Sequence, residues 1–469
     1  MKRGNARGAK GAQEGGWVKD RQTETDPVGV REAKRRGDIQ GEWTFNSKDR
    51  WPWVEPCVWT ERMLDALERG VKGGKWHSLI DKVYSEKNLR ASFERVKRNK
   101  GRAGVDHVTV EAFEERLDEN IAKLHQGLQA GTYRPQAIQR RWIPKPGSRE
   151  KRPLGIPTVR DRVVQTALRH ALEPIFEHGF AAHSYGFRPG CSCKDALRRV
   201  DALLRQGYTH VVDADIKGYF DSIPHDRLMA LVKTQIADGR ILTLIEQFLA
   251  QEILDELERW TPERGSPQGA VISPLLSNIY LDPLDHLMQA QGFEMVRYAD
   301  DFVLLCRDAA EAQAALSLLE EWTAEAGLSL HPDKTHIVDY ASGEGFDFLG
   351  YHFKQGKRWP SAKSMKQIRA AIRTHTRRTN GHSLARIIET LNPMLRGWFE
   401  YYKHSNQWTM SGLDGWVRMR LRSILRKRTK RKGRGRGSDH QRWPNAYFIE
   451  HGLFTLEHAH ERLCQSSPR

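Results

Sequence analysis

The 469-residue sequence lacks several features that mark well-known classes of protein. No stretch reaches the run of about 18 apolar residues that a membrane-spanning helix requires. The N-terminus, MKRGNARGAKGAQEGG, has no apolar segment like that of a secretory signal. Its five cysteines form no C-x-x-C pair, which argues against a zinc ribbon or a disulfide framework. These absences predict a protein of the reducing cytoplasm with no membrane partner.

Acidic residues are also too few to balance the basic ones. The chain has 76 Lys and Arg against 59 Asp and Glu, a net charge of +17. Eleven basic residues and no acid lie within residues 418–436, whereas a merely soluble basic protein would mix the signs. Such a block predicts a polyanionic partner, first of all nucleic acid. The eleven residues are Arg418, Arg420, Arg422, Arg426, Lys427, Arg428, Lys430, Arg431, Lys432, Arg434 and Arg436.

The N-terminal third changes from irregular to helical. Residues 1–60 have little periodicity and predict a flexible basic arm, whose tryptophans suggest docking. From Leu64 onward, apolar spacing predicts helices broken at Gly101 and Gly104. Residues 132–157 contain two extended runs around a Lys-Pro-Gly turn, which predict a basic β-hairpin. A helix over residues 160–176 is expected to follow.

The remaining chain alternates strands and helices before becoming helical. THVVDADIKGYFDSI and GFEMVRYADDFVLLCR predict strands with helices between them, and EGFDFLGYHF predicts a short strand pair. After about Pro360 the spacing is helical, although Pro393 leaves open a fresh helix capped by Asn392. The apolar stripe of this region is Leu384, Ile387, Ile388, Leu391, Leu395, Trp398, Phe399 and Tyr402.

Two adjacent acids, Asp300 and Asp301, interrupt the apolar stretch VRYADDFVLL. Alone, such a pair usually marks a solvated turn. However, VVDADIKGYFDSI supplies Asp213 and Asp215, which share one face if the run is a strand. Carboxylates gathered from two strands repel each other unless a cation lies between them. Mg²⁺ takes such ligands, and two ions roughly 4 Å apart promote phosphoryl transfer. The pattern therefore predicts nucleotidyl transfer.

Ordered motifs carry a resemblance to a known family. D-I-K-x-x-F-D at 215–221, S-P-Q-G at 266–269 and Y-A-D-D at 298–301 resemble a reverse transcriptase palm. RWIPKPGSREKRPLGIPTVRDR, SYGFRPGCSCKDAL, GLSLHPDKT and FLGY follow the order of the group II intron-encoded reverse transcriptase and maturase family. The resemblance, over about residues 62–469, implies an α+β right-hand polymerase. Its fingers and palm would contain an antiparallel sheet, followed by an all-α thumb/maturase domain.

The resemblance also implies domain boundaries. Family members that cleave the second DNA strand carry a Cys-bearing endonuclease, and only Cys464 is available here, so no endonuclease is expected. The expected segments are the N-terminal arm (1–60), the N-terminal extension and fingers (61–205), the palm (206–358), the helical thumb/maturase domain (359–432) and a short C-terminal DNA-binding element (433–469).

Catalytic roles are implied for the acids. Asp215 and Asp300 would be catalytic carboxylates that bind metal, and Asp301 would be a third. Two Mg²⁺ ions are the implied cofactor. Tyr298 would lie by the primer terminus, where primer and template meet.

Basic residues of two loops are implied to contact the triphosphate. Lys145 and Arg152 flank the hairpin turn and would hold its phosphates, with Arg149 and Lys151 as substitutes if the register is shifted. Lys334 is a candidate acid for the departing pyrophosphate. The competing interpretation for each is a solvated surface side chain.

Two further residues are implied to shape the nucleotide pocket. Gln268 would line it, and Gly265 and Gly269 would permit close backbone approach. Phe220 would lie beneath the sugar and exclude a 2′-hydroxyl. A core aromatic is the competing interpretation, and Tyr219 is the alternative if the register is shifted.

The implied function is an RNA-directed DNA polymerase encoded by a group II intron in a bacterium. It would use dNTPs, bind intron RNA as a maturase in splicing, and engage target DNA for retrohoming by target-primed reverse transcription. Residues 418–436 would contact the RNA or the DNA. Two alternatives remain, a maturase whose polymerase site is incidental and a host-adopted relative serving DNA repair or phage defence.

Overall fold

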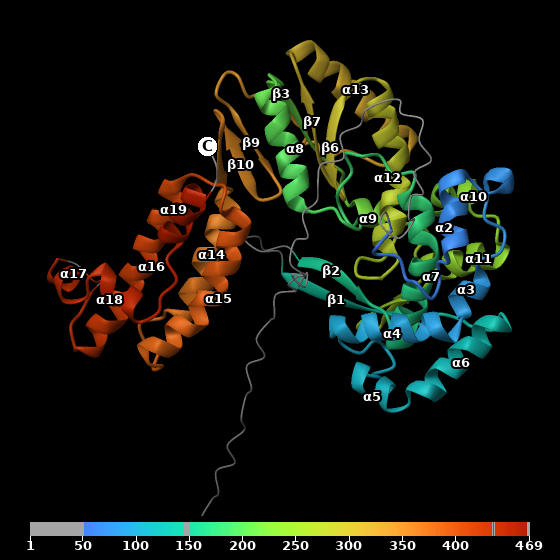
Figure 1. Cartoon of the computed structure of the whole chain (residues 1–469), viewed down its shortest axis with the longest axis horizontal. Coiled ribbons are helices and arrows are strands. Elements are labelled where there is room, and N and C mark those ends of the chain that lie inside the picture. Colours follow the sequence, from blue (N-terminus) through green and yellow to red (C-terminus); the bar gives the residue numbers. More distant parts are fainter. Residues whose placement is uncertain (1–50, 145–150, 434, 436, 467–469) are drawn as a thin grey trace, which may run out of the picture. The chain divides into compact units, whose positions relative to one another are not determined.

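The computed structural model describes residues 51–144, 151–433, 435 and 437–466 (Figure 1). The chain divides into units Met1–Asn46 and Ser47–Arg469, and every described residue belongs to the second. Within these described ranges, no helix is long and apolar enough to cross a membrane. Four residues of the predicted sites, Lys145, Arg149, Arg434 and Arg436, lie outside them.

The last residues of the predicted arm are packed rather than free. Trp51 and Trp59 are buried, and the Trp59 indole N–H donates to the His170 carbonyl at 2.9 Å. Trp53 lies beside Trp51, with ring centroids 5.5 Å apart. The expected docking is therefore confirmed for these tryptophans, and the packed part of the chain includes residues from Trp51 onward.

The helices that precede the palm agree with the apolar spacing. The break at Gly101 and Gly104 falls between two helices, and Thr109 and Thr158 begin helices as caps, their hydroxyls accepting from backbone N–H groups. These helices are α2 (Glu61–Arg69), η1 (Lys72–Gly74), α3 (Ile80–Tyr84), α4 (Glu86–Asn99), α5 (Val110–Glu115), α6 (Leu117–Gln129) and α7 (Val159–Glu177).

The predicted basic hairpin is present. Strands β1 (Ile138–Pro144) and β2 (Lys151–Ile156) pair antiparallel, with Trp142 opposite Pro153. A second hairpin, of β4 (Ile253–Asp255) and β5 (Glu258–Trp260), extends the sheet through a parallel pairing of β1 with β4. This second hairpin was not predicted from the sequence.

The central sheet has the order β6-β7-β3-β8, and all its pairings are antiparallel. Successive side chains of a strand point to opposite faces of the sheet. Val212 and Phe302 accordingly lie in one buried cluster and Val211 and Val303 in another, so the sheet is covered on both faces. The strands are β3 (His210–Asp215), β6 (Glu294–Tyr298), β7 (Asp301–Cys306) and β8 (His336–Asp339).

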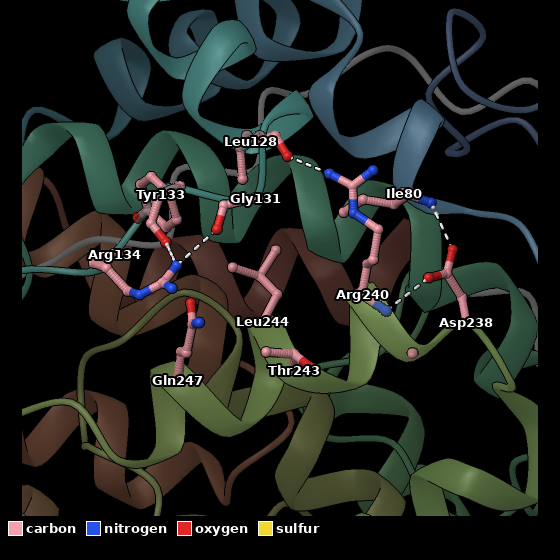
Figure 2. Close-up of a pocket in the computed structure, with 11 residues that line it drawn as sticks. Ile80, Leu128, Gly131, Tyr133, Arg134, Asp238, Arg240, Thr243, Leu244 and Gln247 are labelled. Atoms are coloured by element: carbon pink, nitrogen blue, oxygen red, sulfur yellow. Dashed lines mark hydrogen bonds between the residues drawn. The ribbon is translucent and has the colours of Figure 1, made fainter.

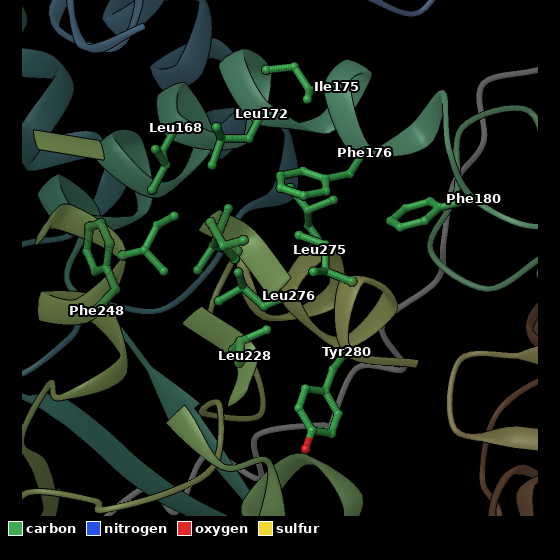
Figure 3. Packing of buried hydrophobic residues seen from close by; sticks show 14 of the residues in the cluster. Leu168, Leu172, Ile175, Phe176, Phe180, Leu228, Phe248, Leu275, Leu276 and Tyr280 are labelled. Atoms are coloured by element: carbon green, nitrogen blue, oxygen red, sulfur yellow. The ribbon is translucent and has the colours of Figure 1, made fainter. Parts of the chain in front are cut away.

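Helices cover the two faces of this sheet. Helix α13 packs on β3 and β7, whereas α8 packs on β6 and β7 (Figure 1). Figure 3 shows side chains of α7, α10, α11 and α12 packed together in the first cluster. The helices of this part are α8 (Cys193–Arg205), α9 (Tyr219–Ser222), α10 (His225–Gln235), α11 (Gly239–Leu249), α12 (Ser273–Ala290) and α13 (Ala309–Glu325).

A three-stranded sheet, ordered β11-β10-β9, precedes the helical C-terminal part and includes the predicted strand pair. Helix α15 runs unbroken through Pro393, so the alternative of a fresh helix there is wrong. Asn392 instead bonds to the backbone of Gly452 and Phe454. The elements are β9 (Gly345–Phe348), β10 (Tyr351–Lys354), β11 (Lys357–Pro360), α14 (Ala362–His375), α15 (Leu384–Tyr402) and α16 (Gln407–Arg428).

The segment after residue 432 is part of the same helical packing. Trp443, Phe448 and Leu456 are buried in the cluster that also contains the whole predicted apolar stripe of α15. The predicted boundary at 432/433 therefore does not separate two packed units. The helices of this segment are α17 (Ser438–Arg442), α18 (Asn445–Glu450) and α19 (Leu456–Ser466).

Candidate active site

Three aspartates meet where the central strands end. Asp215 is the last residue of β3 and lies opposite Asp301, the first residue of β7. Asp300 lies in the two-residue turn that joins β6 to β7. Alternation along the paired strands places Asp213, Asp215 and Asp301 on one face of the sheet, as predicted for the first two.

The turn that carries Asp300 has an unusual backbone conformation. Ala299 has a φ of 60°, in the left-handed region, which costs a non-glycine residue about 1–2 kcal/mol. A Cβ on Gly186 would lie 2.1 Å from the Ala299 nitrogen, so the SYGFRPG loop approaches the turn as only glycine allows. On its other side, Arg297 Nη1 donates to the Ala299 carbonyl at 2.9 Å. The turn is therefore held by two neighbours.

The gathered carboxylates leave excess negative charge at this end of the sheet. Although the Asp301 side chain reaches solvent, partial loss of hydration raises its pKa to about 7, and the charges of Asp213, Asp300 and Asp215 add to the effect. Burial likewise raises the pKa of Asp300. The negative charge of Asp215 raises this pKa further, whereas the positive charge of Arg152 lowers it. A bound cation would stabilise this arrangement.

A backbone contact links this acidic group to another motif. The Leu349 backbone, in FLGY, forms a hydrogen bond with the Asp301 carboxylate, which lowers its pKa. Leu349 itself has a left-handed φ of 47°. The FLGY turn thus lies against the same acidic end of the sheet.

Lys334 is the counter-ion of Asp215. Its Nζ lies 2.6 Å from Asp215 Oδ2, and the His331 N–H donates to the Asp215 carbonyl at 2.7 Å. The Lys334 side chain is 58% exposed, yet its ammonium contacts a carboxylate and is not merely solvated. Its predicted role as an acid stays a prediction.

The donor set fits a hard divalent cation, although the ligands are not fully gathered. No group of three or more His, Cys, Asp or Glu side chains in the described residues is placed to hold a metal ion. The contact with Lys334 engages one oxygen of Asp215. Because Mg²⁺ commonly takes only one or two carboxylates and completes its shell with water and substrate phosphates, oxygen donors of this kind suit it.

Arg152 lies near the acidic group, whereas Gln268 borders a cavity beside the basic hairpin. Arg152, on β2, is close enough to Asp300 to lower its pKa. Gln268 is half-buried and borders a cavity of about 700 Å³, together with Arg140 and Asp221. The cavity lies between the hairpin and the loop that carries S-P-Q-G, and none of Asp215, Asp300 and Asp301 lines it, so the binding roles stay predictions.

Two glycines of this region permit close packing of the backbone. Gly269 has a φ of 104°, and a Cβ there would lie 2.4 Å from the Gly155 carbonyl. Gly265 has a φ of 92°, and its Cβ would lie 2.9 Å from the Asp221 backbone. The close approach that the sequence predicted exists, and its partner is the protein's own backbone.

The aromatic residues after Asp215 differ in burial. Tyr219 is 2% exposed and donates its hydroxyl to the Ser277 carbonyl at 2.7 Å, so it is a core residue and the alternative that it contacts the sugar is wrong. Phe220 is half-buried, with its ring centroid 5.4 Å from that of Tyr219 and 6.5 Å from that of Phe187. Both residues belong to helix α9, where a strand was expected.

A separate cavity, of about 550 Å³, lies among α3, α6 and α11 (Figure 2). Arg134 and Arg240 line it, but they donate to the carbonyls of Gly131 and Leu128 (Figure 2). None of the predicted site residues lines this cavity. It is therefore distinct from the candidate active site.

The basic segment divides into buried and exposed residues. Arg418 and Arg422 are 8% and 2% exposed, and Arg422 Nε donates to the Trp443 carbonyl at 2.8 Å. Because burial keeps both guanidinium groups away from a bound phosphate, the predicted nucleic-acid contact is wrong for these two. Arg420 and Arg426 are half-buried and also donate to protein groups. Among the members that the structure describes, the exposed ones are Lys427, Arg428, Lys430, Arg431 and Lys432.

Arg369 and Arg373 of α14, which the sequence did not mark as contacts, form a basic surface with Arg420 of α16. The guanidinium groups of Arg369, Arg373 and Arg420 lie over Trp416, 5.9, 5.5 and 5.4 Å from its ring. Arg369 and Arg373 are exposed, whereas Trp416 is half-buried. Arg369 and Arg373 are four residues apart on one helix, and residues i and i+4 share a helix face. This spacing was the sequence signal that could have indicated the surface.

Comparisons with known proteins agree with this architecture. Residues 143–353 match the family "Reverse transcriptase (RNA-dependent DNA polymerase)", and residues 365–443 match "Group II intron, maturase-specific domain". The chain therefore has a reverse transcriptase domain followed by a maturase-specific domain. It belongs to the group II intron-encoded reverse transcriptase and maturase family.

Individual relatives come from bacteria, fungi and plants. Group II intron-encoded protein LtrA of Lactococcus lactis is 40% identical over 196 residues, which are 41% of this chain and 32% of LtrA. Protein YkfC of Escherichia coli is 34% identical over 287 residues, 53% of this chain and 74% of YkfC. Nuclear intron maturase 2 of Arabidopsis thaliana is 25% identical over 248 residues, 44% of this chain and 33% of the relative. The chain thus spans about a third of LtrA.

Proposed function

We propose that this protein is an RNA-directed DNA polymerase that also binds group II intron RNA as a maturase. The observation that carries the polymerase proposal is the meeting of Asp215, Asp300 and Asp301 at one end of the palm sheet. Two Mg²⁺ ions would bind there, activate the primer hydroxyl and stabilise the departing pyrophosphate.

The chain's own residues supply the rest of the proposed chemistry. Arg152, together with Lys145, holds the triphosphate, because a guanidinium binds phosphate through two hydrogen bonds. Gln268 and Phe220 contact the incoming nucleotide, and Tyr298 lies against the primer end. Lys334 would give a proton to the departing pyrophosphate, a role supported by the bond of its ammonium to Asp215, one of the carboxylates that would hold the metal.

Intron RNA and target DNA are the proposed macromolecular partners. Support comes from the maturase-specific match and from exposed cations at the end of α16 and around Trp416. Splicing assistance and retrohoming by target-primed reverse transcription follow as the proposed biological roles. The placement of these cations on elements other than the palm sheet supports separate sites for RNA contact and chemistry.

Primer extension and RNA binding test the two parts of this proposal separately. We expect extension of a DNA primer on an RNA template to require Mg²⁺. Alanine at Lys430 should make the plot of log affinity against log salt less steep, with the magnitude of its slope reduced by about 0.7–0.9. Alanine at Lys233, an exposed lysine paired with Glu246 on α10–α11, is the matched control. An unchanged slope for Lys430→Ala, or extension without any divalent ion, would contradict the respective part.

A further inference from the structure

A fully buried arginine, Arg297, is hydrogen-bonded to the turn that carries Asp300. Arg297 is 0% exposed, and its Nε donates to Asp285 Oδ1 at 2.8 Å, with Nη2 bonded to the other oxygen. Its Nη1 donates to Asn278 Oδ1 at 3.0 Å and to the Ala299 carbonyl at 2.9 Å. Asp285 and Asn278 both lie on α12. One guanidinium therefore joins this helix to the turn.

The same network reaches the loop on the other side of the turn. Asn278 Nδ2 donates to the Gly186 carbonyl at 2.8 Å. The Tyr185 N–H donates to the Arg297 carbonyl at 2.8 Å, and the Arg297 N–H donates to the His183 carbonyl at 3.0 Å. The loop, helix α12 and the turn thus form one hydrogen-bonded unit that joins the SYGFRPG and Y-A-D-D motifs.

Stability alone does not account for this buried ion pair. Well-packed apolar residues of similar volume commonly stabilise a protein as well as, or better than, a buried ion pair. A guanidinium differs from them in geometry, because its planar fork fixes the direction of several hydrogen bonds at once. The turn needs such fixing, since Ala299 occupies a left-handed conformation that alanine rarely adopts.

We infer that Arg297, Asp285 and Asn278 are positioning residues that hold the Ala299 carbonyl, and through it the turn, so that Asp300 is presented in one orientation. None of the three contacts substrate in this assignment. They act through the backbone of residues 298–301. The inference rests on the proposed polymerase function and adds the hydrogen-bond network that orients Asp300, one of the carboxylates proposed to bind metal.

Two variants of the full chain separate positioning from stability. The double variant Arg297→Met with Asp285→Leu removes the ion pair and leaves apolar side chains, so its thermal unfolding temperature should stay near that of the wild type. Asn278→Ala leaves the ion pair in place and removes the link to Gly186. Glu173→Gln is the control, because Glu173 is a buried carboxylate paired with Arg169 on α7.

Hydrogen–deuterium exchange and Mg²⁺ activation are the two measurements. In both test variants, we expect amides of a peptide covering residues 296–303 to exchange faster. The Mg²⁺ concentration for half-maximal primer extension should rise about tenfold, the usual effect of removing groups that orient a metal ligand. In Glu173→Gln both should remain at wild-type values, whatever its unfolding temperature.

Unchanged behaviour of the variants would contradict the inference. If folded double and Asn278→Ala variants keep wild-type exchange in this peptide and wild-type Mg²⁺ activation, the network is only structural and the inference is wrong. If the double variant does not fold, Asn278→Ala decides by the same criteria. Absence of primer extension by the wild type would refute the polymerase proposal, and the exchange measurement, which needs no catalysis, would still decide whether the network holds the turn.

Discussion

Replacing Phe220 by valine tests whether this residue excludes ribonucleotides. Phe220 is half-buried beside the buried Tyr219, and it follows Asp215 by five residues at the start of α9. Valine keeps part of the apolar contact and removes the ring. Because fully burying a phenylalanine contributes about 1.5–3 kcal/mol, we expect this half-buried residue to lose roughly 1 kcal/mol of unfolding free energy.

The expected functional effect of Phe220→Val is larger than the effect on stability. Opening the space beneath the sugar should lower the preference for dNTP over rNTP by at least about tenfold, which corresponds to ~1.4 kcal/mol of discrimination. Single-nucleotide insertion kinetics with matched dNTP and rNTP measure the ratio directly. The control is Tyr219→Phe, which keeps the buried ring and removes only the hydrogen bond to Ser277. An unchanged ratio in a folded, active Phe220→Val enzyme would refute the assignment.

Three further changes should have distinct effects. Gly186→Ala brings a Cβ to 2.1 Å from the Ala299 nitrogen, so we expect primer extension to be lost with little change in RNA affinity; normal extension would show that the loop can move away. Ending the chain after Lys432 removes the buried Trp443 and Phe448, each worth about 3–5 kcal/mol on truncation to alanine, so thermal unfolding should shift to much lower temperature. An unshifted transition would mean that the C-terminal helices are dispensable for packing. Chelation of divalent ions should stop DNA synthesis and leave RNA binding in a filter assay intact; loss of both would argue that metal also maintains the RNA-binding surface.

Local patterns predicted most of the elements that position the site. The hairpin of β1 and β2, helix α7 and strands β3, β6 and β7 follow from periodicity, because each has several side chains that alternate or recur. The three-residue strands β4 and β5 are too short to show a period, and they form because β1 offers β4 an edge to pair with. The strand expected across residues 215–223 ends at Asp215. Helix α9 follows, and its Tyr219 side chain is buried in the core.

Charge patterns predicted less about individual residues. Composition cannot distinguish the buried Arg422 from the exposed Lys427, because the difference arises from packing of the C-terminal helices against α16. The bond of Lys334 to Asp215 joins residues 119 positions apart and has no local signal. The contacts of Arg297 with Asp285 and Asn278 likewise have no local signal in the sequence. The adjacent Y-A-D-D motif nevertheless indicated the turn itself.

The most direct test of the central proposal compares wild type with Asp300→Asn in one preparation. Asparagine keeps the size of the side chain and removes the charge that the metal requires. We predict that extension of a DNA primer on an RNA template falls by at least about 100-fold, as expected when electrostatic stabilisation of a transition state is removed. The affinity for group II intron RNA should stay within about twofold, because the exposed cations of α14 and α16 are unchanged. Wild-type extension by the folded variant, or loss of RNA binding together with synthesis, would contradict the account.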